Sequence, residues 1–251
     1  MVRILLDNSM LDYSYNSDFR YTHDNPYHDK LALFENFVMR DQEAEQFRDQ
    51  WNEKVFKRAA PLCVEIGTGY GHFMLEYCRN NPHENFVGLD YRFKRSYSLA
   101  KQLSAIEAGQ FKYLRAKGER IHFQFGDSEV DKIYYFFPDP WPKNRHHKKR
   151  LFQEPFLAAA YKILKPNGKI FIKTDHDEYA QWMKKVIDKD RAQAHKKNGA
   201  QLFDCELASL DLRAEYPKHF LCSFETKFEK IFLAKKIKIK GFVLKSKKGA
   251  H

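Results

Sequence analysis

The chain has 251 residues, of which 43% are hydrophobic and 31% are charged, a size and composition that suit one large α/β domain. No apolar run approaches the roughly 20 residues that span a bilayer, and the start, MVRILLDNSM, is too briefly apolar for a signal peptide, so we expect a cytoplasmic protein without membrane contact. The net charge of +11 favours a polyanionic partner, unless the charges only solvate the surface.

The first 60 residues carry the weakest pattern. Residues 1–30 are rich in tyrosine, aspartate and asparagine and indicate an irregular arm. Strong helix formers fill residues 31–58, where we expect one or two helices that end before Pro61. We therefore predict an N-terminal arm with helices over residues 1–60, whose role stays open.

From Leu62 onward, short apolar runs alternate with helical patterns. Five runs predict strands of a buried parallel sheet, namely LCVEI, NFVGLD, FKYLR, DKIYYFF and GKIFIKTD. The stretches HFMLEYCRN, RFKRSYSLAKQLSAIEAG and QEPFLAAAYKILKPNG lie between them and have helical patterns. Such alternation implies right-handed crossovers and therefore an α/β fold with a doubly wound, mostly parallel sheet.

The C-terminal part departs from this alternation. QLFDCEL, TKFEKIFLAKK and IKIKGFVLK predict a strand, a helix and a closing strand that runs antiparallel. The basic stretch at residues 246–251 is expected to form a frayed tail. The main domain is thus predicted to cover residues 61–245.

The first predicted strand runs into a glycine-rich loop, EIGTGYG, in which Gly67, Gly69 and Gly71 follow Glu65. Glycines let the backbone turn sharply and approach a ligand at the carboxyl end of a strand. The second strand ends at Asp90, whose carboxylate can accept hydrogen bonds from both hydroxyls of a ribose. A structural turn or an NAD site would show a similar loop, but Glu65 suits a cofactor with a positively charged amino-acid end. The stretch resembles the loop of S-adenosylmethionine-dependent methyltransferases.

A second loop, FFPDPWPKNRHHKKR, follows the fourth predicted strand and ends at Arg150. Its three prolines make it stiff, and it emerges at the edge of the sheet where ligands bind. Asp139 offers a carboxylate for the N–H groups of a base, and Trp141 offers an aromatic face. Most of the cations after it, up to Arg150, are expected to meet phosphates. An exposed proline turn followed by a solvated basic face is the alternative.

The sequence resembles a known family, the bacterial-type tRNA (guanine-N7)-methyltransferases. The resemblance covers about residues 61–245 and is best in four blocks, VEIGTGYG, FFPDPWPKNRHHKKRLFQEPFL, TDHDEYAQWM and TKFE. It implies transfer of a methyl group from S-adenosyl-L-methionine to N7 of the guanine in the tRNA variable loop. It also implies the Rossmann-like class I methyltransferase fold, a mostly parallel doubly wound sheet with an antiparallel last strand.

Family roles carry over where positions match. Glu65 and Asp90 correspond to the contacts with the methionine end and the ribose of the cofactor, and the glycines between them border it. Asp139 matches the family's catalytic aspartate, which also borders the cofactor. Residues that match the family's tRNA-binding positions are Lys143, Asp175, Thr226, Lys227, Phe228 and Glu229.

One stretch departs from the family pattern. After the third strand the family usually has an aspartate near the adenine, followed by a small residue, whereas this chain has Lys117 there and Glu119 two positions on. The adenine contact is therefore expected either from Glu119 or from backbone groups around Lys117.

Guanine N7 carries no proton at neutral pH, so its methylation needs no general base and depends mostly on alignment. Asp139 either favours the charge that arrives on the base or only positions it. Two other functions stay open: a methyltransferase acting on an amine of another RNA, of DNA or of protein, and a non-catalytic RNA-binding protein of the same fold. Amine enzymes often carry Asn-Pro-Pro-Tyr or Asp-Pro-Pro-Tyr after the fourth strand, which differs from the sequence here.

The cysteines and histidines show no metal-ligand spacing, so no metal is expected. Cys63, Cys78, Cys205 and Cys222 form no C-x-x-C pair, and we expect reduced thiols rather than the bridges of a secreted domain. The partner implied by the resemblance is tRNA, and the protein is expected to be a monomer or a homodimer.

Overall fold

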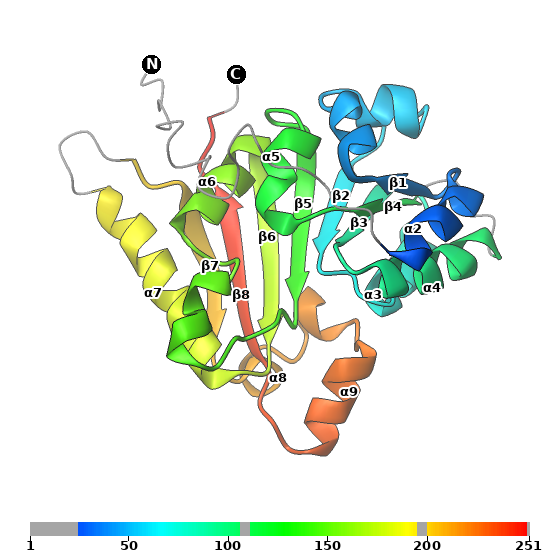
Figure 1. Ribbon diagram of the computed structural model, residues 1–251. Coiled ribbons are helices and arrows are strands. Elements are labelled where there is room, and N and C mark those ends of the chain that lie inside the picture. The colour runs from blue at the N-terminus through cyan, green and yellow to red at the C-terminus, as the bar shows by residue number, and fades with distance from the viewer. Residues whose placement is uncertain (1–24, 106–110, 195–199, 250–251) are drawn as a thin grey trace.

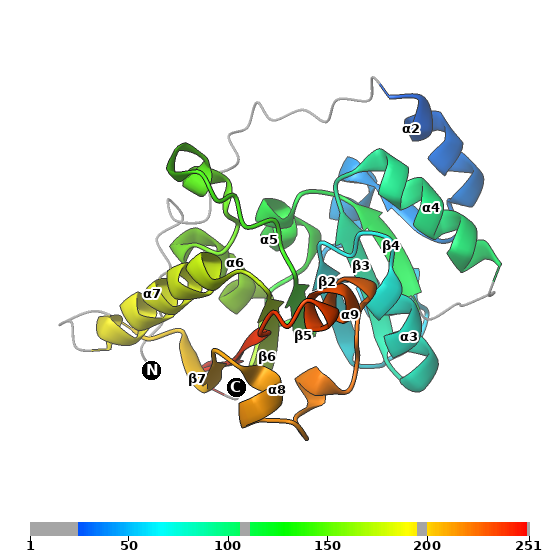
Figure 2. The same cartoon turned by 90° about the horizontal axis from the view of Figure 1, so that it is seen from below.

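The computed structural model describes residues 25–105, 111–194 and 200–249. Most of the predicted irregular arm and the last residues of the predicted tail lie outside these ranges. In the described part of the chain, eight strands form one sheet in the order β1-β4-β3-β2-β5-β6-β8-β7, with helices on both faces (Figures 1 and 2).

The sheet is parallel except for β8, which runs antiparallel to both of its neighbours, β6 and β7. The strands are β1 (Val38–Arg40), β2 (Leu62–Ile66), β3 (Asn85–Asp90), β4 (Phe111–Arg115), β5 (Val130–Phe136), β6 (Leu164–Thr174), β7 (Phe203–Ser209) and β8 (Lys240–Ser246). The prediction of a mostly parallel, doubly wound sheet with an antiparallel last strand is confirmed.

Helices connect the strands. They are α2 (Pro26–Leu31), α3 (His72–Asn80), α4 (Phe93–Ser104), α5 (Ile121–Gln124), α6 (Glu154–Ile163), α7 (Asp177–Gln193), α8 (Leu212–Glu215) and α9 (Lys227–Ala234), with a short 3-10 segment, η5 (Asn144–Lys149). The sequence analysis did not predict α5, α8 or η5, because they are too short to show a helical period. It also assigned no helix to α7, and α2 lies mostly in the segment that was expected to be irregular.

Two hydrophobic clusters cover the two faces of the sheet. In β2, Leu62, Val64 and Ile66 belong to one cluster, whereas Cys63 belongs to the other. The same alternation recurs along β3 and β5. Because side chains point alternately to opposite faces, a strand covered on both faces must be apolar throughout. Burial on both faces explains why the strands appear in the sequence as unbroken apolar runs.

The segment between residues 31 and 58 differs from the one or two helices expected there. It contains η1 (Ala32–Phe34), β1, η2 (Asp41–Phe47) and a π-helical turn, η3 (Trp51–Val55). β1 adds a parallel edge strand beside β4. The Trp51 ring is buried and stacks on Phe125 at 5.2 Å, and its indole N–H donates to the Gln124 carbonyl at 2.7 Å. Tertiary packing of this kind outweighs helix propensity here.

Candidate functional site

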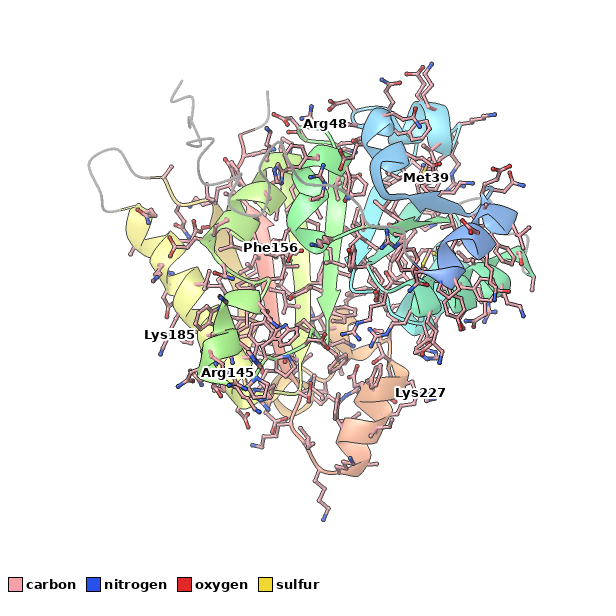
Figure 3. All side chains as sticks on the ribbon, in the orientation of Figure 1. Met39, Arg48, Arg145, Phe156, Lys185 and Lys227 are labelled. Atoms are coloured by element: carbon pink, nitrogen blue, oxygen red, sulfur yellow. The ribbon has the colours of Figure 1, made fainter. Side chains whose placement is uncertain are left out.

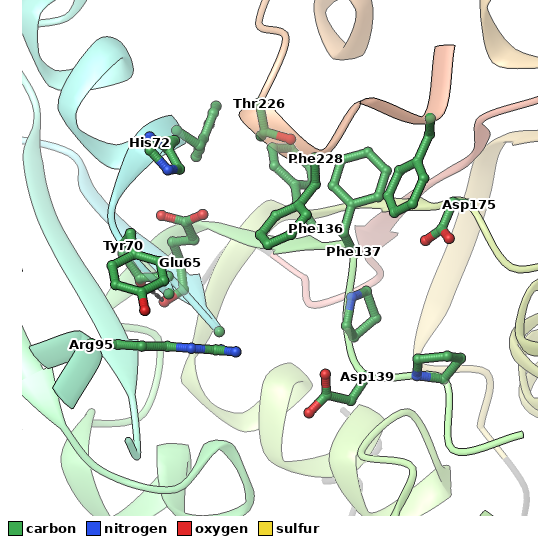
Figure 4. Close-up of a pocket in the computed structure, with 17 residues that line it drawn as sticks. Glu65, Tyr70, His72, Arg95, Phe136, Phe137, Asp139, Asp175, Thr226 and Phe228 are labelled. Carbon is green, nitrogen blue, oxygen red and sulfur yellow. Dashed lines mark hydrogen bonds between the residues drawn. The ribbon is translucent and has the colours of Figure 1, made fainter. Parts of the chain in front are cut away.

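Two adjoining cavities open at the edge of the sheet where β2, β3 and β5 end. The first, shown in Figure 4, has a volume of about 310 Å³, and the second has about 300 Å³. The residues that line both are Gly67, Arg95, Phe137, Pro138 and Asp139. The glycine loop after β2, the start of α4 and the loop after β5 therefore form the boundary between the cavities.

The glycine loop has the backbone conformation that its sequence predicts. Gly67, Gly69 and Gly71 all have left-handed φ angles, of 82°, 60° and 77°. Residues with a Cβ atom rarely adopt such angles. At Gly71 a Cβ atom would also lie 2.4 Å from Cδ1 of Leu99. Hydrogen bonds from the Gly67 and Thr68 N–H groups to the Leu89 carbonyl, at 2.7 and 3.0 Å, hold the loop beside β3.

Glu65 lines the first cavity and is only 4% exposed. Its Oε2 atom has no hydrogen-bond partner among the described residues. Burial, and next the Asp90 carboxylate, raise the pKa of Glu65 to about 8. A buried acid with an open acceptor atom fits a ligand that brings a positively charged N–H donor.

Asp90 lies in the wall of the second cavity at the end of β3. It accepts hydrogen bonds from the Gly69 and Arg92 N–H groups, both at 2.9 Å, and the Arg95 guanidinium lies 3.6 Å away. A carboxylate offers about four lone-pair sites. These contacts fix the orientation of the carboxylate at the wall of the second cavity.

The residues expected near an adenine also line the second cavity. Ala116, Lys117 and Glu119 all contribute to its wall. The Lys117 ammonium lies over the Tyr91 ring, 5.1 Å from its centre. Both predicted sources of the adenine contact, the Glu119 side chain and the backbone around Lys117, are thus present at this cavity.

Asp139 lies on the boundary between the cavities, and its side chain is 60% exposed. Its carboxylate lies 3.4 Å from the Arg92 guanidinium. The residues on either side of its loop, Phe137 and Trp141, have left-handed φ angles of 50° and 44°. Such conformations of non-glycine residues cost of order 1–3 kcal/mol each and persist only where the surroundings impose them.

Arg150 is one of the contacts that hold this loop. It donates to the Pro140 carbonyl at 2.8 Å and to Glu178 at 3.0 Å, and its guanidinium lies 5.1 Å from the Tyr179 and Trp182 rings. It is 1% exposed. The expectation that the basic run up to Arg150 meets phosphates is therefore wrong for Arg150, because its charge points into the protein.

The remaining cations of the basic run stay at the surface. Lys143 precedes η5, and Lys143, Arg145, Lys148 and Lys149 are all exposed. The Lys149 ammonium lies 4.7 Å from the centre of the Trp141 ring, and both residues line the second cavity. Lys143 lies outside the lining of both cavities.

The other residues expected to bind tRNA divide into three groups. Asp175, Thr226 and Phe228 line the first cavity. Lys227 is exposed on α9 and lies outside the lining. Glu229 is fully buried, and both of its oxygens are paired with cations of the protein.

The buried pairs of Glu229 anchor α9 to the sheet. The carboxylate accepts from the Lys173 ammonium at 2.5 Å and from Arg213 at 2.7 Å. Lys173, on β6, also donates to the carbonyls of Leu221 and Phe224, at 3.1 and 2.8 Å. Thr226 caps the helix by accepting the Glu229 N–H at 3.2 Å. α9 is thereby held beside the first cavity.

The sequence reasoning missed several residues of the first cavity. His72, Arg95 and Phe232 line it, and burial together with nearby Lys227 lowers the pKa of His72. Arg95 had a usable signal, since it lies shortly after Asp90, near the start of a helix pattern. Phe232 had none, because its place depends on how α9 folds back over the sheet.

This sheet order, with a glycine loop after β2 and an acid at the end of β3, is that of the Rossmann-like class I methyltransferase fold. Solved structures share the fold. The 16S rRNA methyltransferase KamB superposes with a TM-score of 0.52 at 16% identity over 82% of this chain and 93% of that one. TrmN from Thermus thermophilus superposes with a TM-score of 0.51 at 18% identity, over 82% of this chain and 47% of that one.

Sequence comparison identifies the family. Residues 59–230 match the family model described as "Putative methyltransferase". The tRNA (guanine-N(7)-)-methyltransferase of Geobacillus thermodenitrificans is 36% identical over 154 residues, which are 61% of this chain and 70% of that protein. The enzyme of the same name from Enterococcus faecalis is 39% identical over 58% and 67% of the two chains. The chain belongs to the tRNA (guanine-N7)-methyltransferase family.

One relative has a different organisation. A bifunctional glycosyltransferase/methyltransferase of Fusobacterium nucleatum is 31% identical over 201 residues, which are 78% of this chain and 30% of that protein. The chain therefore spans about a third of that relative's length. In the described part of the chain, no helix is long and apolar enough to cross a membrane, and no three potential metal ligands cluster.

Proposed function

We propose that this protein transfers a methyl group from S-adenosyl-L-methionine to N7 of the guanine in the variable loop of tRNA, in the cytoplasm. The observation that carries the proposal is the position of Asp139 on the boundary between the two cavities. A cofactor that extends from Glu65 in the first cavity to Asp90 in the second would pass this boundary, so a residue there can touch both the cofactor and an acceptor base. Family membership supports the same reaction.

The residues present fit S-adenosylmethionine. The unpartnered Oε2 of buried Glu65 would accept from the ammonium of its methionine end, a donor that the described residues do not provide. Asp90 would accept from the ribose hydroxyls in the second cavity. The wall formed by Lys117 and Glu119 lies next to it and would border the adenine. The glycine loop lets the ligand approach the backbone between these two acids.

The first cavity suits a flat, aromatic acceptor. Phe136, Phe137 and Phe228 line it together with Thr226 and Asp175. Bound S-adenosylmethionine supplies a methyl group already activated by a positively charged sulfur. Asp139 would hold the guanine by its N1–H and amino group, so that N7 faces the methyl, and its negative charge would favour the positive charge that develops on the base.

The function is tested by mapping the methylated atom. Unmodified tRNA is incubated with the protein and S-adenosylmethionine, reduced with borohydride and treated with aniline, which cleaves the chain at N7-methylguanosine. We expect a single cut in the variable loop. Methyl incorporation without a cut would show that an amine is the acceptor, and absence of incorporation would favour a non-catalytic RNA-binding protein; either result overturns the proposal.

Asp139 has its own test. Asp139→Asn keeps the shape of the side chain but removes its charge, and so we expect turnover to fall by about 10²-fold or more. The affinity for S-adenosylmethionine, measured by calorimetry, should stay close to that of the unchanged protein, because Glu65 and Asp90 remain. Turnover near the original rate would remove Asp139 from the reaction.

A further inference from the structure

A second basic surface lies on α9, apart from the run that follows Asp139. The outward residues recur at helical spacing: Lys227, Lys230 and Ile231 are followed one turn later by Ala234 and Lys235, and all are exposed. We call this set the outer face of α9. The opposite side of the helix, with Glu229, Phe232 and Leu233, packs towards the sheet.

Negative charge is missing from this outer face. In the stretch TKFEKIFLAKK the single acid is Glu229, which is fully buried and neutralised by Lys173 and Arg213. Within the described part of the chain, Lys230 and Lys235 form no ion pair, whereas Lys238, just beyond the helix, pairs with Asp211 at 3.0 Å. Burying the acid leaves a purely cationic surface, which attracts a polyanion.

The outer face also has a defined relation to the acceptor site. Thr226 and Phe228, at the start of the same helix, line the first cavity, while Trp141 and Lys149 line the second. Figure 3 shows Arg145 and Lys227 on opposite sides of this edge of the molecule. A strand whose base enters the first cavity would therefore continue over α9 in one direction and over η5 in the other.

We propose that the outer face of α9, through Lys230 and Lys235, is a second docking surface for the phosphate backbone of the tRNA substrate. This inference rests on the proposed function for the identity of the RNA. Exposed lysines meet phosphates and carry no sequence preference, so the surface would position the RNA on the side of the cavity away from η5. Ile231, 40% exposed between the lysines, would pack against sugars.

The test replaces both lysines, as Lys230→Gln with Lys235→Gln. The matched control is Lys57→Gln with Arg79→Gln, two exposed cations that shortly precede β2 and β3 in the chain and so lie towards the amino ends of these strands, away from the cavities. Equilibrium binding of unmodified tRNA is measured for each protein over a series of salt concentrations. Each lost phosphate contact should reduce the slope of log affinity against log salt by about 0.7–0.9.

We expect the α9 variant to bind tRNA several-fold more weakly, with its salt slope reduced by about 1.5 for two contacts, and the control to behave like the unchanged protein. The methylation rate of the α9 variant at saturating tRNA should be unaltered, since neither Lys230 nor Lys235 lines a cavity. A slope equal to that of the control overturns the docking surface. Failure of the unchanged protein to methylate N7 would instead overturn the proposed function, and the binding series would still decide the surface.

Discussion

Burial changes the chemistry of two charged residues beside the cavities, Glu65 and Arg150. The Glu65 carboxyl, with a pKa raised to about 8, holds its proton at neutral pH for much of the time when no cation lies beside it. Arg150, by contrast, is 1% exposed, and its guanidinium donates to Pro140 and Glu178 inside the protein instead of facing solvent. Both residues are strongly polar in the sequence, and their different environments decide what each can do.

The affinity for S-adenosylmethionine should depend on pH through Glu65. An ammonium binds the ionised carboxylate, so below the raised pKa binding must first release a proton. Affinity should therefore rise as the pH increases from about 6 and level off above about 8, the pKa of Glu65. Glu65→Gln should bind more weakly, by roughly 1.5–3 kcal/mol at pH 8, and lose this pH dependence. Calorimetry measures the affinity of both proteins across this pH range. If the affinity of Glu65→Gln changed with pH in the same way as that of the unchanged protein, the prediction would be contradicted.

Arg150 should act by positioning the loop that carries Asp139. Arg150→Lys keeps a positive charge but cannot reach Pro140 and Glu178 together in the fork geometry of a guanidinium. We expect a lower kcat at saturating tRNA, with an unchanged slope of log KM against log salt concentration.

The exposed Lys148 and Lys149 should behave in the opposite way. Replacing both by glutamine should raise KM and flatten its dependence on salt concentration. Steady-state kinetics at several salt concentrations separates the two roles, and a flattened slope for Arg150→Lys would place it at the RNA.

At the scale of elements, the apolar runs predicted the first and last residues of β2, β3 and β4 correctly, and a helical pattern did the same for α3. Burial on both faces demands such runs, and the glycine loop between β2 and α3 follows from local backbone preference. What the sequence could not predict depends on distant partners. Glu229 matches a tRNA-binding position, yet Lys173, 56 residues away, pairs with it in the interior. β1 is stabilised by pairing with β4 rather than by its own three residues.

The anchoring of α9 can be tested with two acids that share one partner. Glu225 and Glu229 both pair with Arg213, at 3.0 and 2.7 Å, but Glu225 is 39% exposed and Glu229 is fully buried. Glu229→Gln leaves the Lys173 charge buried without a counter-charge, and should lower the free energy of unfolding by about 3–5 kcal/mol. Glu225→Gln should change it by less than about 1 kcal/mol. Urea unfolding of both variants checks this; equal effects would mean that burial does not set the strength of the pair.

At the scale of the whole molecule, the sequence predicts a domain boundary near residue 61, but residues before this boundary belong to the core. Ala44, Trp51 and Phe56 are part of the larger hydrophobic cluster. The domain limits stay a prediction, whereas the family match over residues 59–230 marks the part that carries the resemblance. Sequence similarity alone does not show which flanking residues complete a core.

A chain that starts at residue 61 should therefore be less stable than the full chain. It loses the edge strand β1 and the buried Trp51 ring, and truncating a buried tryptophan alone costs about 3–5 kcal/mol. We expect a lower midpoint in urea and a broader transition. The comparison with the single substitution Trp51→Ala shows how much of the loss comes from that ring. A truncated chain as stable as the full one would mean that residues before 61 pack on the domain without supporting it.

The place of β8 in the sheet has a consequence for how the protein is made on the ribosome. β7 precedes β8 in the chain, yet it touches β6 only through β8, which lies between them. A growing chain cannot complete this side of the sheet until residues 240–246 have emerged, and until then β6 keeps an open edge of the kind that invites misassociation. α9, which borders the first cavity, lies between β7 and β8 in the chain, whereas the glycine loop and Asp90 come much earlier. The nascent protein thus completes the acceptor side of its site last.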